Sequence, residues 1–361
     1  MMAARQPVPT LRDVAERAGV SLATASRVLN PSERIVGDRL RQRVLDAAAA
    51  VNYVPNAHAQ ALAGDTSSTV GVIVHDVSDP YFSAIASGVF DVADRHGLLV
   101  VICNAHRDPL RELQYVSMLR SQRVRAIVLA GSAFEATRHE DRMSRELSGH
   151  VASGGKVAVI SRATIDANRV LPDNRGGGGQ LGTALTELGP HSFAVLGGPV
   201  GMTTGRDRLA GFRDALGSRG VHLDPRLVLS GDFSRSGGHA AAIELLDRGI
   251  PFSALVALND LMAIGALAAL KERGIHVPDD ISLTGFDDIE AVRDVEPAIT
   301  TVRVPMAEMG ARAVTLALAD SADDPIIEHV PVEVVLRAST GPPARIRPNL
   351  DHPLCTPKEY A

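Results

Sequence analysis

Near its start the chain places apolar residues at the spacing of short amphipathic helices. One set recurs at positions i, i+3, i+4 and i+7 and consists of Leu11, Val14, Ala15 and Ala18. This spacing puts the four side chains on one face of a helix. Thr10 is a suitable N-cap, Asp13 can complete a variant of the capping box, and Gly19 ends the helix.

A second short helix is predicted directly after the first, with Ser21 as its cap. Its buried face consists of Ala25, Val28 and Leu29, and its exposed residues are Leu22, Ala23, Ser26, Arg27 and Asn30. Two short helices joined through a glycine turn form a helix-turn-helix or an αα-hairpin that merely packs. The exposed face favours DNA binding, because arginine can read guanine in the major groove while serine, threonine and asparagine hold phosphates.

A third helix is predicted from about Asp38 to Val51, and three helices can close a small core. In the segment 55–67 that follows, Pro55 can start a helix of about two turns, which is marginal by itself in water. We expect this segment to be a linker that folds against DNA and a partner copy. Leu62 is its only large apolar residue.

From residue 69 the pattern changes to short apolar runs that alternate with helical segments. The runs are TVGVIVHDV, LLVVICN, AIVLAGS, KVAVISR, SFAVLGG, ALVALND and ISLTGFDD. Short valine-, isoleucine- and leucine-rich strands separated by helices indicate parallel sheets covered on both faces. The series is long enough for two such subdomains.

Polar residues follow several of these strands, at the edge where open α/β sheets bind ligands. They are His75, Asp76, Asn104, Ser132, Ser161, Arg162, Asn259, Asp260, Asp287 and Asp288, joined by Arg206 and Phe233 from loops. Carboxylate, amide, arginine and aromatic groups together suit a small polyhydroxylated ligand. The alternative is that each polar residue caps a neighbouring helix. We favour capping for Asp76, Asp260 and Asp288, and ligand contact for Arg206 and Asp287.

Composition and charge indicate that the chain is divided into domains. The 361 residues are 45% hydrophobic and 22% charged, which is ordinary for a globular protein of two or three domains. Residues 1–64 hold eight arginines and five acids, a net charge of +3, so the remainder carries −8 of the total of −5. A positive head on an acidic body suggests that the head meets a polyanion.

Other classes of protein find little support. The two cysteines, Cys103 and Cys355, make a disulfide framework implausible, and no secretory leader or membrane-length apolar run is visible, so we expect a cytoplasmic protein. The glycine-rich stretches lack the dinucleotide and P-loop patterns, and no zinc-protease or nucleophile-elbow motif occurs. We therefore predict no enzyme, no metal and no cofactor. The glycine run 176–179 is expected to let a helix begin close to the other lobe.

Two segments resemble the head piece and hinge of the LacI/GalR family of bacterial transcription regulators. They read T-L-x-D-V-A-x-x-A-G-V-S-x-x-T-x-S-R-V-L-N and Y-V-P-N-x-x-A-Q-x-L-A-G, and the resemblance extends over about residues 10–340. It implies that the second helix enters the major groove and that Leu62 wedges open the central base step in the minor groove. The implied DNA-binding residues are Thr10, Ser21, Leu22, Ala23, Thr24, Ser26, Arg27, Asn30, Tyr53, Asn56, Ala59 and Leu62. Ala25 and Leu40 depart from the valine and threonine common in the family.

The body is similar to periplasmic sugar-binding proteins, in which two lobes close on a ligand. The resemblance implies seven effector-binding residues: His75, Phe82, Arg162, Arg206, Phe233, Asn259 and Asp287. Arg206 is assigned from the stretch R-x-R-L-x-G-F. Asp79 and Ser161 depart from the family, which often has asparagine at the first position and usually has aspartate at the second.

These inferences combine into one prediction. The domains are a helix-turn-helix domain at 8–54, a hinge helix and linker at 55–67, a two-lobed effector and dimerisation domain at 68–340, and a proline-rich tail at 341–361. Lobe 1 takes about 68–162 and 294–322, and lobe 2 takes about 163–293 and 323–340.

The predicted function is a transcription regulator, in the first instance a repressor, that binds a near-palindromic operator. It acts as a homodimer, because the tail has no leucine heptad, and it is controlled by a sugar or sugar-like effector. No membrane contact is expected. The alternatives are a stand-alone solute-binding protein and a corepressor-dependent or activating regulator.

Overall fold

The structure is a computed structural model that describes residues 9–29, 36–54, 67–131, 138–161, 165–190, 192–319 and 324–342. Five of the predicted site residues lie outside these ranges: Asn30, Asn56, Ala59, Leu62 and Arg162. Their expected roles stay predictions. Among the described helices, none combines the length and apolar character needed to cross a membrane.

The head piece consists of three helices, α1 (Leu11–Ala18), α2 (Leu22–Leu29) and α3 (Asp38–Ala50). The predicted capping box is present at α1, where Thr10 and Asp13 cap each other's backbone N–H groups. Gly19 ends the helix with φ of 61°, a left-handed conformation that glycine adopts at little cost. The small core consists of Val14, Ala15, Ala18, Ala25, Val44, Ala47 and Ala48.

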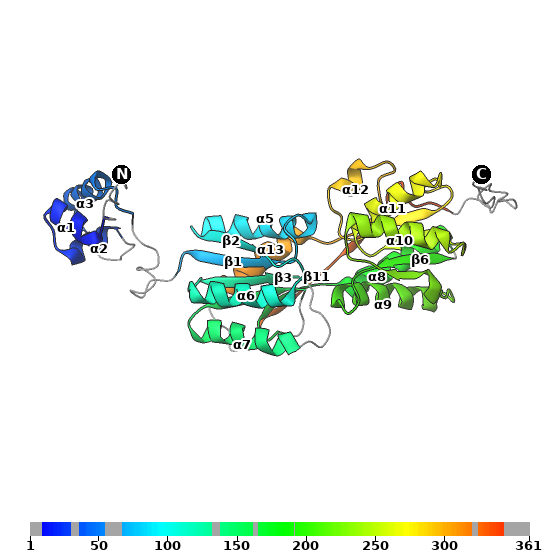
Figure 1. The fold of residues 1–361 in the computed structure, drawn as a ribbon, viewed down its shortest axis with the longest axis horizontal. Coiled ribbons are helices and arrows are strands. Elements are labelled where there is room, and N and C mark those ends of the chain that lie inside the picture. Colours follow the sequence, from blue (N-terminus) through cyan, green and yellow to red (C-terminus); the bar gives the residue numbers. More distant parts are fainter. Residues whose placement is uncertain are drawn as a thin grey trace, which may run out of the picture.

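The first lobe is built on a six-stranded parallel sheet in the order β11-β5-β4-β3-β1-β2. Its strands are β1 (Thr69–Val74), β2 (Leu99–Asn104), β3 (Ala126–Ala130), β4 (Lys156–Ile160), β5 (Asn168–Pro172) and β11 (Ile327–Val330). Helices α5 (Pro80–Arg95) and α13 (Met306–Leu318) pack together on one face, and α6 (Pro109–Ser121) and α7 (Arg138–Ala152) on the other (Figure 1). The buried strands therefore alternate side chains between two apolar layers.

The second lobe has a four-stranded parallel sheet in the order β7-β6-β8-β9. Its strands are β6 (Phe193–Gly197), β7 (Val228–Ser230), β8 (Ala254–Ala257) and β9 (Ser282–Thr284). Helix α8 (Asn174–Leu188) packs on α9 (Thr203–Ser218), and α10 (Arg235–Asp247) packs on α11 (Asp260–Glu272). The short elements η1 (Pro225–Leu227) and α12 (Ala291–Asp294) complete the lobe.

The glycine run at the start of α8 lets this helix pack closely against α9. A Cβ on Gly178 would lie 2.1 Å from the carbonyl oxygen of Arg208, on α9 of the same lobe. A Cβ on Gly211 of α9 would lie 1.9 Å from the carbonyl oxygen of Arg175. Gly178 and Gly211 thus let two helices of one lobe approach closely. As expected, α8 also begins close to the other lobe, because Asn174 follows the end of β5 by two residues.

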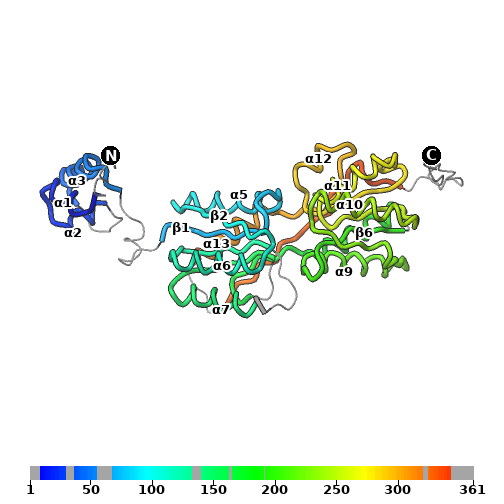
Figure 2. Tube along the Cα trace, in the orientation of Figure 1, coloured from blue at the N-terminus to red at the C-terminus, as the bar shows by residue number. Residues whose placement is uncertain are grey.

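Within the described residues, the chain passes between the lobes three times, near residues 172–174, 301–306 and 330–336. Two of these passages pair with each other as the antiparallel strands β10 (Thr301–Arg303) and β12 (Glu333–Val335). Figure 2 shows these orange and red-orange segments running between the lobes.

The sheets correct the expected lobe boundaries. The expected boundaries place β5 and β11 in lobe 2, but both strands extend the sheet of the first lobe, where β5 pairs with β4 and β11 pairs with β5. Both strands are short and mix polar with apolar residues, so their pattern alone does not show which sheet they join. The first lobe therefore continues to Pro172, and its second segment runs from α13 to the end of β11 at Val330.

Candidate functional site

Helix α2 presents an exposed face of small and polar side chains. Ser21 begins the helix by accepting a hydrogen bond from the N–H of Thr24 at 3.1 Å. Ala25 is fully buried in the core, and Leu22, Ala23 and Arg27 lie exposed on the opposite side, with Leu22 half exposed at 50%. The helix thus exposes one cationic fork, Arg27, together with the apolar side chains of Leu22 and Ala23.

The other predicted DNA contacts of the head piece occupy mixed positions. Thr24 and Ser26 are half-buried beside this face, and Tyr53 packs partly against the core. Thr10 is exposed, but its hydroxyl already donates to Asp13 Oδ2 at 2.8 Å. Arg43 of α3 donates to the carbonyl oxygen of Gly19, so this arginine joins α3 to the turn that precedes α2.

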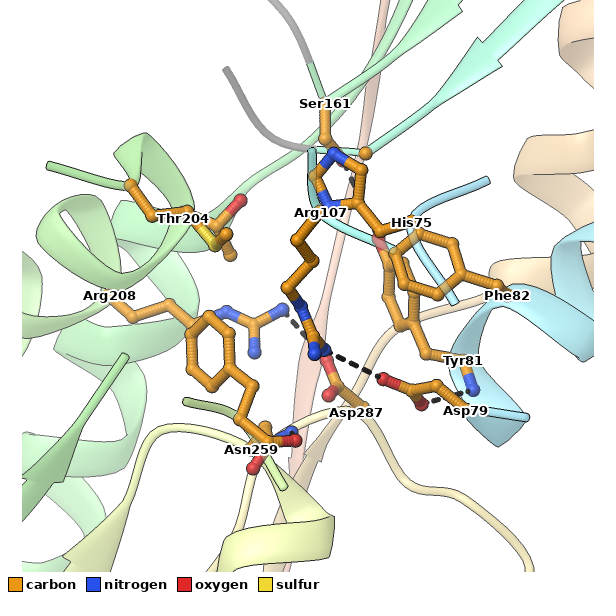
Figure 3. Close-up of a pocket in the computed structure, with 13 residues that line it drawn as sticks. His75, Asp79, Tyr81, Phe82, Arg107, Ser161, Thr204, Arg208, Asn259 and Asp287 are labelled. Carbon is orange, nitrogen blue, oxygen red and sulfur yellow. Dashed lines mark hydrogen bonds and ion pairs between the residues drawn. The ribbon is translucent and has the colours of Figure 1, made fainter. Parts of the chain in front are cut away.

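A cavity lies between the two lobes, at the ends of their strands. Its empty volume, which includes space open to solvent, is about 420 Å³. It is lined by His75, Asp79, Tyr81, Phe82, Arg107, Gly131, Ser161, Met202, Thr204, Arg208, Phe233, Asn259 and Asp287 (Figure 3). Five of the predicted effector residues are therefore brought together: His75, Phe82, Phe233, Asn259 and Asp287.

Arg206 is the exception, and the structure corrects its predicted place. It is not among the lining residues, and its guanidinium hydrogen-bonds the carboxylate of the neighbouring Asp207. Arg208 lines the cavity instead. Side chains two positions apart on a helix point in nearly opposite directions. The spacing of apolar residues in α9 could have identified Arg208. Phe212 and Leu216 lie on the buried face of the helix, and Arg208, four residues before Phe212, lies on the same face.

Arg208 and Asp287 form the polar centre of the second lobe's wall. The guanidinium donates to Asp287 Oδ1 at 2.7 Å, to Asn174 Oδ1 at 2.8 Å and to the carbonyl oxygen of Leu258 at 2.7 Å. It also lies 3.8 Å over the ring of Phe286. Burial raises the pKa of Asp287 to about 8, although the Arg208 charge opposes this shift.

Asn259 and Phe233 support each other beside this pair. The Asn259 side chain accepts from the N–H of Met262 at 2.9 Å, which caps α11, and donates to the carbonyl oxygen of Phe233 at 3.0 Å. The second bond holds the Phe233 backbone, whose φ is 61°. Asn259 therefore positions the aromatic ring at the cavity as well as lining it.

The first lobe's wall holds a second carboxylate–guanidinium pair that the predicted site did not contain. Asp79 caps α5 through the N–H of Tyr81 at 3.0 Å and lies 3.6 Å from Arg107 Nη2. Burial raises the pKa of Asp79 and raises that of Tyr81 to about 12. In Figure 3, Arg107 lies between this wall and Arg208. Arg107 shortly follows β2, so the search at strand ends could have found it.

The first lobe's wall also contains His75, Phe82, Gly131 and Ser161. The His75 ring lies against Phe82, with ring centroids 5.6 Å apart. The Ser161 hydroxyl is 3.5 Å from that of Tyr81. Ser161 was named as a polar residue after its strand but was left out of the predicted site. Tyr81, Met202 and Thr204 were missed, because they lie at or near helix starts and not directly after strands.

All three expected capping assignments are wrong, and Asp79, not Asp76, caps α5. Asn259, and not Asp260, caps α11. Asp260 instead accepts from the hydroxyl of Thr301 and the N–H of Ile289, and Asp288 binds three arginines. Asp76 does make local bonds, to the N–H and hydroxyl of Ser78.

The chain matches two family models. Residues 10–56 match the lacI family of bacterial regulatory proteins, and residues 183–340 match a periplasmic binding protein-like domain. The chain is 35% identical over 339 residues to the HTH-type transcriptional regulator DegA of Bacillus subtilis, covering 92% of this chain and 98% of DegA. It is 37% identical over 328 residues to GalR of Escherichia coli, covering 88% and 91%.

Solved structures agree with this assignment. The lac repressor dimer bound to operator and an anti-inducer superposes with a TM-score of 0.78 at 28% identity, covering 92% of this chain and 99% of that one. A complex of the transcriptional regulator CelR with cellobiose gives 0.68 at 29% identity, with the same coverage. These matches confirm the predicted fold class and the predicted role in transcription, and the relatives named are regulators and not enzymes. The chain belongs to the LacI family of bacterial regulatory proteins.

Proposed function

We propose that this regulator is a repressor that binds a near-palindromic operator as a homodimer, and that a sugar or sugar-like ligand in the interlobe cavity controls this binding. The observation that carries the proposal is the composition of the cavity. Each lobe contributes one carboxylate and one guanidinium, and Phe233 adds an aromatic ring. Carboxylate and guanidinium groups hydrogen-bond hydroxyls, and an aromatic face covers the apolar side of a sugar ring.

The carboxylates have acceptor capacity left for a ligand. Asp287 uses Oδ1 for Arg208, and Asp79 uses Oδ1 for the cap of α5. Asp287 Oδ2 accepts no hydrogen bond from the described residues, and Asp79 Oδ2 has only Arg107 Nη2 at 3.6 Å as a partner among them. A ligand with several hydroxyl donors would satisfy both oxygens, one from each lobe, and would favour a closed arrangement of the lobes.

The DNA contacts follow from the exposed face of α2. We propose that Leu22, Ala23 and Arg27 reach base edges and that Ser21, Thr24 and Ser26 hold phosphates, with Thr10 and Tyr53 beside the backbone. Asn30, Asn56, Ala59 and Leu62 are assigned by family resemblance alone. Arg27 carries most of the hydrogen-bonded readout, because leucine and alanine offer only van der Waals contact.

An apolar face supports the homodimer. Strand β2 ends the first lobe's sheet, and its Leu99 is 64% exposed. Phe90 on α5 and Leu110 and Met118 on α6 are also exposed, on the helices before and after β2. We name these four residues the β2 face. An apolar sheet edge that is left open invites pairing with another chain, and a second copy supplies the second half-site reader. We assign the protein to the cytoplasm, where its operator lies.

The test is selection of bound fragments from randomised DNA with the purified full-length protein at moderate salt. We expect a symmetric site, whose affinity is then measured with cellobiose and a panel of neutral mono- and disaccharides. Weaker operator binding identifies an inducer, and tighter binding identifies a corepressor. No enriched sequence, with or without the sugars, would contradict the proposal and favour a solute-binding role.

A further inference from the structure

Strands β8 and β9 are each followed by a pair of polar residues whose members face different ways. Asn259 and Asp287, the first members, line the cavity. Asp260 and Asp288, the second members, are buried and do not line it. Both bind residues of the segments that pass between the lobes. We call Asp260, Asp288, Thr301, Arg303 and Arg337 the crossover cluster.

Asp260 connects the start of α11 to β10. Its Oδ1 accepts from the hydroxyl of Thr301, the first residue of β10, at 2.6 Å. Its Oδ2 accepts from the N–H of Ile289 at 2.9 Å, in the loop that carries Asp287. The side chain is fully buried. One carboxylate therefore joins the loop that lines the cavity to the strand that leaves the lobe.

Asp288 makes the same connection with charge. Arg303 of β10 donates to its Oδ2 at 2.7 Å, and Arg337, just after β12, donates to its Oδ1 at 2.5 Å. Arg293 adds a bond at 3.1 Å. Burial alone would raise the pKa of Asp288, but these arginines outweigh burial and hold the pKa below its usual value. Asp288 is therefore stable as a charged carboxylate that binds arginines through both of its oxygens.

The backbone makes the two carboxylates of this pair move together. Asp287 and Asp288 have φ values of 122° and 61°, a conformation that costs energy for residues other than glycine and persists only where contacts enforce it. The N–H of Asp287 donates to the carbonyl oxygen of Val302 at 2.8 Å, and the N–H of Val304 donates to that of Asp287 at 3.2 Å. A shift of the cavity-lining Asp287 must therefore displace β10.

We propose that Asp260 and Asp288 are positioning residues that couple the cavity to the relative orientation of the lobes. Rotation of one lobe against the other must be absorbed where the chain passes between them. The crossover cluster fixes two of those three passages to the second lobe, beside Asp287. That a ligand acts on this coupling rests on the proposed function, but the coupling itself is a property of the free protein.

The test is the distribution of distances between the lobes, measured by double electron–electron resonance between two spin labels. The full-length chain carries Cys103→Ser and Cys355→Ser, with cysteines introduced at exposed Ser148 of α7 and Ser218 of α9. Labelled chains are diluted into excess unlabelled protein, so that only distances within one chain contribute. Asp288→Asn keeps the shape of the side chain and removes its charge. We expect it to broaden or shift the distribution relative to the parent, and Asp260→Asn to do the same.

Glu333→Gln is the matched control, because it removes only the outer partner of Arg303, an exposed carboxylate at 2.6 Å. We expect its distribution to equal that of the parent. If Asp288→Asn does not fold, Arg303→Lys replaces it, since lysine keeps the charge and loses the fork. A folded variant with lowered stability and an unchanged distribution overturns the proposal and leaves the cluster a merely structural role. No ligand enters this test, so its failure is distinct from failure of the proposed sugar site.

Discussion

At the scale of single residues, Arg208 is the most constrained group of the cavity. Its guanidinium makes three hydrogen bonds with different partners and stacks on Phe286, and its side chain is only 3% exposed. This arrangement presents a fixed planar fork beside Asp287. A lysine cannot reproduce it, because an ammonium group lacks the planar donors and the stacking face.

We therefore predict that Arg208→Lys weakens ligand binding roughly 10- to 100-fold, as the loss of about 1–3 kcal/mol of hydrogen bonding implies. Operator binding should stay within about twofold of the parent, because the head piece is untouched. Calorimetric titration with the sugar found in the screen, together with operator titrations, measures both effects. Arg206→Lys is the control and should bind the ligand normally. An equal loss of ligand affinity in Arg206→Lys would show that the ligand site includes Arg206.

Asp260 predicts a dependence of stability on pH. Burial raises its pKa to about 6 in the folded chain, above the ordinary value of 3.8 that applies when unfolded. The folded state therefore holds the proton more tightly. The free energy of unfolding should fall by on the order of 2–3 kcal/mol through this group as pH rises from about 4 to about 6, and then level off.

Denaturant titrations of the parent and of Asp260→Asn across this pH range isolate the effect. The difference between the two free energies of unfolding should change with pH in that window and stay constant above it. Asp288, whose pKa is lowered, contributes to both proteins and cancels in the difference. Parallel curves would show that Asp260 titrates normally.

At the scale of elements, the helix pair α8 and α9 depends on close contact without side chains between the backbones. A Cβ on Gly178 would lie 2.1 Å from the backbone oxygen of Arg208, which cannot yield without moving α9 and the cavity arginine with it. One position along, a Cβ on Gly179 would lie 3.7 Å from the oxygen of Gly211, an ordinary contact.

We predict that Gly178→Ala destabilises the chain by about 1–3 kcal/mol, the usual cost of overpacking. Gly179→Ala should be neutral or should stabilise by about 0.5–1 kcal/mol, because alanine favours the helix. Denaturant unfolding followed by circular dichroism compares the two. Equal effects of both substitutions would mean that the helices have room to separate.

Elements also show how far sequence reasoning reaches. The head-piece helices and the strong apolar strands were predictable, because their spacing and caps are local. Strands β5 and β11 were placed in the wrong lobe, because membership of a sheet depends on pairing between distant segments. In the cavity, His75 and Asp287 follow strands and were found, whereas Arg208 depended on the rotation of a helix. The local pattern predicts caps at Asp260 and Asp288, because nothing local indicates that a strand from a later part of the chain lies against them.

At the scale of the whole molecule, the proposed function places two copies of the chain on one operator. We predict that Leu99→Asp, at the most exposed apolar position of the β2 face, shifts the protein toward monomer, because a buried carboxylate would disfavour pairing. Operator affinity should fall at least about tenfold at the same protein concentration. Sedimentation and operator titration measure both quantities. Val151→Asp is the control, because Val151 is similarly exposed on α7, away from the β2 face. A dimeric Leu99→Asp protein would place the interface elsewhere.

The buried carboxyl of Asp287 links ligand binding to the release of protons. With a pKa raised to about 8, this group holds a proton more readily near neutral pH than an ordinary aspartate does. Hydroxyl donors stabilise its ionised form and lower the pKa, so arrival of the ligand expels protons into the buffer. Affinity should therefore increase from pH 6 to pH 8, and titrations in buffers of different ionisation enthalpy should give different heats. At a given sugar concentration, a larger fraction of the protein would then bind the sugar in an alkaline cell than in an acidified one.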